Sequence, residues 1–227
     1  MVALIRLYVQ MGDQATATQC YEQLTKLSGR IKLPRECQLY ERLAAAILAQ
    51  ATGDQQMALH AAEQAGQLNE QGGEILFRLI DTALILGHTR AAVGQWDRAA
   101  AAFQFALDAF QQFGNAALAA EPQADLAQIA LTQGDLVTAQ TQVEAILPVL
   151  AVQPHAGYNN PFFIYLICHR VLAANDDPRA ATILQQGYDL LHQDAASLDE
   201  ESRQRFLTAV ATHRALMTAY REQEGQR

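Results

Sequence analysis

The feature that most constrains this chain is a short turn that recurs at an almost constant spacing. Each copy lies between two segments in which apolar residues recur at helical intervals. The copies are Gly12–Asp13, Gly53–Asp54, Gly94–Gln95, Gly134–Asp135 and a degenerate Asn175–Asp176, at intervals of 41, 41, 40 and 41 residues. A fixed period of this length is typical of repeat architectures, in which each unit buries its apolar face against its neighbours.

Residues on both sides of the turn keep the same register. An alanine stands five residues after each turn glycine or asparagine: Ala17, Ala58, Ala99, Ala139 and Ala180. Small residues also recur seven before the turn and twelve after it, and they include Gly87 and Gly187. Such positions predict places where two antiparallel helices approach closely. The turn glycine can end the first helix, and the aspartate that follows can cap the second.

Composition supports a helical reading of every repeat. The chain of 227 residues is 50% hydrophobic and 7% aromatic, with alanine and leucine dominant, and both are strong helix formers. We therefore expect an all-α solenoid that forms one repeat domain over residues 1–227. A capping helix is expected at 199–222, opened by a capping box from Ser197 to Glu200. The predicted antiparallel hairpins span about 1–28, 36–70, 73–114, 118–152 and 161–196.

The third repeat carries the strongest family resemblance. From Gly94 to Ala106 it reads Gly-Gln-Trp-Asp-Arg-Ala-Ala-Ala-Ala-Phe-Gln-Phe-Ala, and this resembles the turn and second helix of the tetratricopeptide repeat family. The period of 41 is longer than that family's usual period of about 34 residues. Longer repeats of this kind are similar to the helical sensor regions of large bacterial signalling ATPases and maltose-regulator-like transcription activators. The resemblance implies a superhelix whose first helices line a concave groove.

Candidate binding residues follow from carrying the family's groove positions onto this chain. The positions are counted back from each turn, and those in the C-terminal half hold aromatic or hydrogen-bonding side chains. Such side chains on a concave surface suit a peptide or a small ligand. A solenoid must also place some residues on this face without any partner, so a purely structural reading stays open. The candidates are His88, Glu121, Gln128, Phe162, Tyr165 and His169.

Charge and motif content exclude several classes of function. The net charge is −8 with an isoelectric point of about 5.2, and no cluster of Lys and Arg offers the basic patch that nucleic-acid binding needs. The three cysteines match no metal or redox spacing, and no histidine pairs with another ligand at metal-binding spacing. No catalytic or phosphate-binding motif occurs. We therefore expect no enzyme activity, no cofactor and no metal, and we expect His213 and Arg214 to form a surface pair.

The ends of the chain bear on its location and assembly. The N-terminal segment lacks a signal peptide, and no apolar stretch is long enough to span a bilayer, so a soluble cytoplasmic protein is expected. The first helix starts at Met1 without a cap, which suggests a fragment of a larger protein. Exposed apolar residues in this uncapped N-terminal hairpin, Leu4, Leu7 and Tyr8, favour a homodimer.

Two functional hypotheses remain at this stage. The first is a non-catalytic scaffold that binds a protein or peptide partner in the groove with roughly micromolar affinity, or about 8 kcal/mol. The alternative is a ligand-sensing regulatory module of a larger bacterial signalling ATPase or transcription regulator. That alternative predicts a small pocket in the C-terminal half of the chain.

Overall fold

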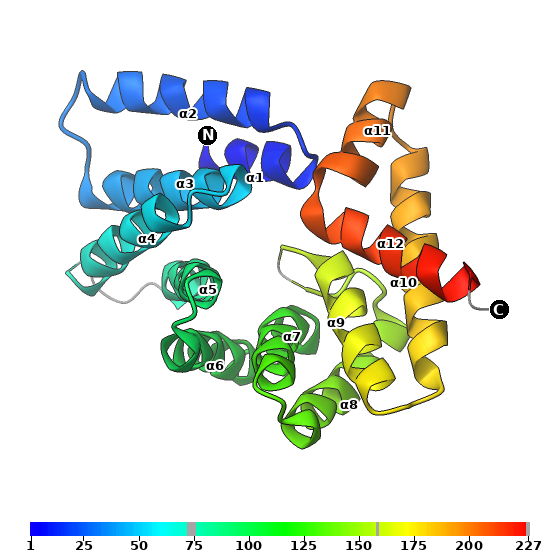
Figure 1. Cartoon of the computed structure of the whole chain (residues 1–227). Coiled ribbons are helices and arrows are strands. Elements are labelled where there is room, and N and C mark those ends of the chain that lie inside the picture. The colour runs from blue at the N-terminus through cyan, green and yellow to red at the C-terminus, as the bar shows by residue number, and fades with distance from the viewer. Residues whose placement is uncertain (72–75, 158, 226–227) are drawn as a thin grey trace. The chain divides into compact units, whose positions relative to one another are not determined.

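The computed structural model describes residues 1–71, 76–157 and 159–225. Over these residues the chain forms α-helices and no strand, and the helices follow one another as antiparallel pairs (Figure 1). The all-α repeat fold predicted from the sequence is confirmed. Two compact units divide the chain, Met1–Ala109 and Phe110–Arg227, and each is described by itself. That the whole chain forms a single repeat domain stays a prediction.

Short turns at the repeat positions separate the two helices of each pair. Their bounds are α1 (Val2–Gln10), α2 (Gln14–Ser28), α3 (Arg35–Thr52), α4 (Gln55–Glu70), α5 (Leu76–Ala92), α6 (Trp96–Gln112), α7 (Ala116–Thr132), α8 (Leu136–Val152), α9 (Pro161–Ala174), α10 (Arg179–Ala196), α11 (Glu200–Ala209) and α12 (Ala211–Gly225). The start of the third hairpin, predicted at residue 73, lies outside the described residues.

The turn glycines end the first helices by adopting the left-handed backbone conformation. Gly53, for example, has φ of 85° and closes α3, a conformation that a residue with a Cβ adopts only at a cost. The next residue, Asp54, then caps α4 because its carboxylate accepts a hydrogen bond from the Met57 N–H at 2.9 Å. Asp13 and Asp135 cap α2 and α8 in the same way.

The degenerate fifth turn lies one residue later than the sequence predicts. Its left-handed residue is Asp176, with φ of 53°, rather than Asn175. Asn175 instead ends α9, and its side-chain amide donates to the Val171 carbonyl at 2.9 Å. Asp is one of the few residues besides glycine that tolerate this conformation, so the turn keeps its shape without glycine.

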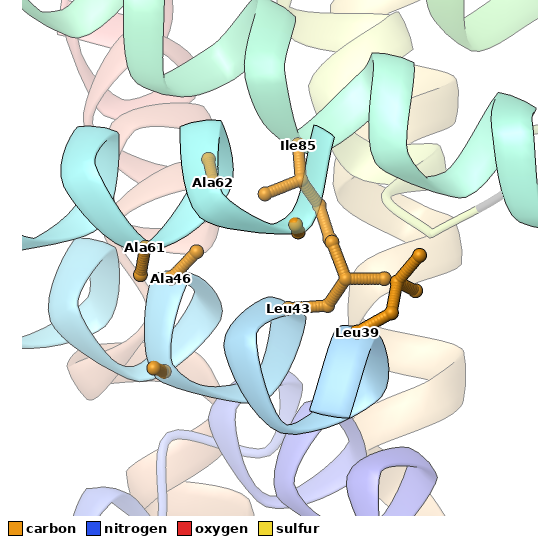
Figure 2. Close-up of a cluster of buried hydrophobic side chains, with 8 residues drawn as sticks. Leu39, Leu43, Ala46, Ala61, Ala62 and Ile85 are labelled. Atoms are coloured by element: carbon orange, nitrogen blue, oxygen red, sulfur yellow. The ribbon is translucent and has the colours of Figure 1, made fainter. Parts of the chain in front are cut away.

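In the first unit, the core joins successive hairpins through alanine and leucine. One buried cluster lies where α3, α4 and α5 meet, and Figure 2 shows Leu43 of α3 close to Ile85 of α5. Small side chains such as Ala46 and Ala61 let α3 and α4 approach closely, as the repeat predicts. The cluster comprises Leu39, Leu43, Ala45, Ala46, Ala61, Ala62, Ala65 and Ile85.

The expected C-terminal capping helix is two helices. The chain leaves helical geometry at Val210, which has φ of −77° and ψ of 121°, so α11 ends there and α12 begins at Ala211. A side chain of α12 replaces one of the lost backbone bonds, because the His213 imidazole donates from Nδ1 to the Phe206 carbonyl at 2.7 Å. The cap of α11 is also not the predicted box: Asp199, rather than Ser197, accepts from the Ser202 N–H.

His213 is therefore buried and not part of a surface pair, while its neighbour Arg214 is exposed. Burial lowers the pKa of His213 below its ordinary value of 6.5, against the opposing hydrogen bond to Phe206 and the more distant charge of Asp194. The unfolded chain then takes up a proton at higher pH than the folded chain does. This contribution to stability is complete above the unfolded pKa and is lost progressively as the pH falls from the unfolded pKa through the lower folded pKa.

Replacing His213 with asparagine should flatten this pH dependence. His213→Asn keeps a side-chain amide donor but removes the titrating group, so the variant loses stability at about pH 7.5 and loses less on acidification than the wild type. Urea unfolding midpoints at about pH 7.5 and about pH 5.5 test this, because His169 titrates in both proteins and cancels in the comparison. If the difference in urea midpoint between the wild type and the variant is the same at both pH values, His213 does not cause the pH dependence of stability.

Candidate partner-binding cleft

The first unit holds one predicted site residue. His88 lies half-buried on α5, and its ring centroid is 5.1 Å from that of Phe103 on α6 at an interplanar angle of 57°. This contact leaves part of the imidazole open to solvent. The other five predicted residues lie on α7 and α9 of the second unit.

Glu121 is buried and organises the start of α9. The residue is 1% exposed, and Oε2 of its carboxylate accepts hydrogen bonds from the backbone N–H groups of Asn159 and Asn160. Asn160 in turn caps α9 by accepting from the Phe163 N–H. The carboxylate of α7 thus holds the segment that leads into α9, which is an internal structural role.

Phe162 and Tyr165 are also buried by internal contacts. The Phe162 ring packs edge-on against Phe206, with centroids 6.0 Å apart, and against His213 at 4.8 Å. The Tyr165 hydroxyl donates to the Pro154 carbonyl at 3.1 Å, and burial raises the pKa of Tyr165 to about 12. With these contacts in place, little of either ring is available to a partner, and a binding role for them stays a prediction.

Gln128 and His169 are the predicted residues of the second unit that keep an open surface. The Gln128 amide donates to the hydroxyl of Thr132 on the same helix at 3.0 Å. His169 on α9 is half-buried, and its Nδ1 lies 3.1 Å from the carbonyl of Ala180 on α10. A carbonyl only accepts, so Nδ1 carries the proton and Nε2 remains an acceptor. Burial lowers the pKa of His169 below its ordinary value of 6.5, against the opposing hydrogen bond to Ala180, and the adjacent Arg170 lowers it further, so the neutral imidazole predominates at pH 7.

His169 lines an open cleft of about 550 Å³ between α9 and α12, called here the α9–α12 cleft. Figure 1 shows α12 packed beside α9 and α10 within the second unit. The lining combines two arginines, one glutamate and a row of small side chains. Its residues are His169, Arg170, Ala211, Arg214, Ala215, Thr218, Ala219 and Glu222. This volume falls within the range of small-molecule sites.

The two arginines of the cleft carry charges that the second unit leaves unneutralised. Arg214 is exposed and donates to the Thr208 carbonyl at 3.2 Å. Arg170 is exposed, and among the described residues neither arginine makes an ion pair. An exposed arginine keeps its fork of donors available for a carboxylate.

A second, smaller pocket of about 320 Å³ lies beside Tyr165 where α8, α9 and α10 meet. Its lining combines apolar side chains with amides and one carboxylate. The lining residues are Leu150, Ala151, Pro154, Tyr165, Gln186, Asp189, Leu190 and Gln193.

Sequence reasoning found His169 but missed Arg170 and Arg214. The groove positions were counted from the turns, and that count covers only helices inside the hairpins. The cleft needs α12, whose position depends on the break at Val210. No motif signals that break, so the sequence alone did not bring Arg214 toward α9.

Neither a metal-binding cluster nor a membrane-spanning helix occurs among the described residues. No group of three or more His, Cys, Asp or Glu side chains is placed to hold a metal ion in residues 1–71, 76–157 and 159–225. Among the described helices, none is both long enough and apolar enough to cross a bilayer. Cys168 is buried, and burial raises the pKa of its thiol to about 12, so this cysteine behaves as a core residue.

Comparison with known proteins supports the fold. No protein-family model matches the chain, and no curated protein matches it significantly. Among solved structures, a protein assigned as a kinesin light chain from Podosopora anserina, with nearly identical TPR-like repeats, is similar at a TM-score of 0.59 and 19% identity. That match covers 85% of this chain and 94% of the other. BtubC (BKLC) from P. vanneervenii is similar at a TM-score of 0.57 and 15% identity, over 94% of this chain and 90% of that one. The chain therefore has a TPR-like helical repeat fold.

Proposed function

We propose that this chain is a non-catalytic scaffold that binds a protein or peptide partner through its second unit. The observation that carries the proposal is the α9–α12 cleft, which is open, contains the predicted residue His169, and presents two exposed arginines. Helical repeats with an open polar surface of this kind suit a chain segment better than a buried reactive substrate. The similarity to TPR-like repeat structures agrees with this reading at the level of fold.

Capture from a lysate of the source organism tests the scaffold. The wild type is compared with Gln128→Ala/His169→Ala, which shortens the two open predicted side chains of the second unit, and with Gln104→Ala/Thr141→Ala, which shortens two exposed polar side chains elsewhere. We expect a protein captured by the wild type and the control and lost by the site variant, and we expect the purified pair to bind directly. If neither the purified wild type nor the purified control variant binds any captured protein directly, the chain is not a scaffold.

A ligand-sensing module is the second candidate, and the pocket of about 320 Å³ beside Tyr165 favours it. The alternative predicted a small pocket in the C-terminal half, and this pocket is lined by residues from 150 to 193. A regulatory module of a larger signalling ATPase or transcription regulator would use such a pocket. A small-molecule thermal-shift screen separates the candidates, because a ligand that stabilises the wild type but not Gln186→Ala would favour sensing.

We also propose that the outer face of α1 pairs with a second copy of the chain. Leu4 and Leu7 are 48% and 49% exposed. One repeat later, the equivalent residues Ala45 and Leu48 are buried. Leu48 packs in a cluster with Ile5 of α1 and Ala17 of α2, so the preceding hairpin covers the same face of α3. A second copy that presents the same face supplies this cover.

Carboxylates introduced on the outer face of α1 should abolish dimerisation. Leu4→Glu/Leu7→Glu places two carboxylates on a surface that must lose water to pair, so we expect a monomer at concentrations where the wild type dimerises. Light scattering across a wide concentration range measures this, with Val137→Glu as the control because Val137 is 80% exposed in the second unit. A wild-type mass that stays monomeric throughout would contradict the proposal.

A further inference from the structure

The charge of the α9–α12 cleft differs in sign from that of the whole chain. Arg170 and Arg214 face one carboxylate, Glu222, and His169 is neutral because burial lowers its pKa. The cleft therefore carries a net positive charge on a protein whose net charge is −8. Two arginines against one carboxylate make this cleft locally attractive to an anionic group.

The walls of the cleft suit a polypeptide main chain. Ala211, Ala215 and Ala219 stand four residues apart and so share one face of α12, where they line the cleft. Their short side chains leave room for a backbone to approach α12. Across from them, His169 keeps Nε2 as a hydrogen-bond acceptor, because its Nδ1 is committed to the Ala180 carbonyl. An N–H group of a main chain or an amide satisfies that acceptor.

We infer that the α9–α12 cleft binds an acidic peptide segment of the partner, with Arg170 and Arg214 receiving its carboxylates. This inference rests on the proposed scaffold function and names the chemistry of its partner. Guanidinium groups bind carboxylates through paired, charge-assisted hydrogen bonds. The two arginines therefore bind carboxylates more strongly and more specifically than point charges would. A nucleic acid needs several phosphate contacts, and the lining of this cleft holds only these two cations.

Fluorescence anisotropy with the full chain tests the inference. The probe is a fluorescein-labelled peptide of alternating glutamate and serine, and a peptide with glutamine in place of glutamate is the neutral counterpart. We expect the acidic peptide alone to bind, and to bind more weakly as salt is raised. Arg170→Glu/Arg214→Glu should weaken binding at least tenfold, or about 1.4 kcal/mol, because repulsion replaces attraction.

The matched control is Arg221→Glu, which reverses an exposed arginine on the same helix outside the cleft. It should change the affinity by less than about twofold, since Arg221 does not line the cleft and its exposed charge is screened by solvent and salt. Equal binding of the two peptides, equal effects of the cleft and control variants, or tighter binding of a single-stranded oligonucleotide than of the peptide would each overturn the inference. If the acidic peptide fails while the captured partner still binds directly, the scaffold stands and only its acidic specificity falls.

Discussion

Phe162→Ala should lower the free energy of unfolding by about 3–5 kcal/mol, the usual cost of emptying the site of a buried aromatic ring. Phe162 is 4% exposed and joins α9 to the C-terminal helices through Phe206 and His213, whose own ring centroids are 4.3 Å apart. Removing the ring leaves these two side chains facing a cavity. Chemical denaturation of the full chain measures the loss, and hydrogen exchange should show faster opening of α11 and α12.

The same substitution at an exposed phenylalanine provides the control. Phe105 is 43% exposed on α6, so Phe105→Ala should cost about 1 kcal/mol or less. The pair of variants also separates the two roles open to Phe162. A Phe162→Ala protein that is as stable as Phe105→Ala but no longer captures the partner would place this ring on a binding surface, as the groove positions predicted.

Gly87→Ala should destabilise the first unit by about 3 kcal/mol, at the upper end of the usual cost of overpacking. A Cβ at this position would lie 2.4 Å from Cε1 and 2.7 Å from Cδ1 of Phe103. Phe103 is 1% exposed, so its ring has no open direction in which to move. The glycine thus sets how closely α5 and α6 pack, and urea denaturation measures the loss.

An opposite outcome is expected at a second helical glycine. At Gly66 on α4, an added Cβ meets only the terminal Cδ1 of Leu86 at 3.3 Å. Gly66→Ala should therefore be neutral or stabilise by up to about 1 kcal/mol, since alanine favours helix. Adding Phe103→Leu to Gly87→Ala should cost less than the two single changes together. If Gly87→Ala is as stable as Gly66→Ala, the contact of the added Cβ with the Phe103 ring does not lower the free energy of unfolding.

The elements that sequence predicted well are those with local causes. Turn glycines and their aspartate caps act within four residues, so the periodic turns identify the hairpins directly. Small residues such as Gly87 were predicted at close approaches because antiparallel helices require them at fixed offsets from the turn. The fifth turn has no glycine, and Asn175 and Asp176 both tolerate the left-handed conformation, so the residue type alone did not decide which of them adopts it.

The candidate site was less predictable because it depends on contacts between distant segments. Groove positions counted from the turns take no account of what covers each helix. Phe162 is covered by Phe206 and His213, which lie more than forty residues later, and Glu121 is engaged by the segment that leads into α9. The break at Val210 decides both that cover and the place of Arg214. His213 replaces a backbone hydrogen bond at this break, and periodicity alone does not reveal the break.

Site-specific photocrosslinking tests the central claim, that the second unit holds a protein partner, most directly. A benzophenone amino acid replaces Thr218, an exposed residue of the cleft, or Arg30, an exposed residue of the first unit, and each protein is irradiated in a lysate of the source organism. A scaffold that binds through the second unit predicts one crosslinked protein at position 218, absent at position 30, with an acidic segment at the site of attachment. Crosslinking of no protein at position 218, or of the same proteins at both positions, would contradict the claim.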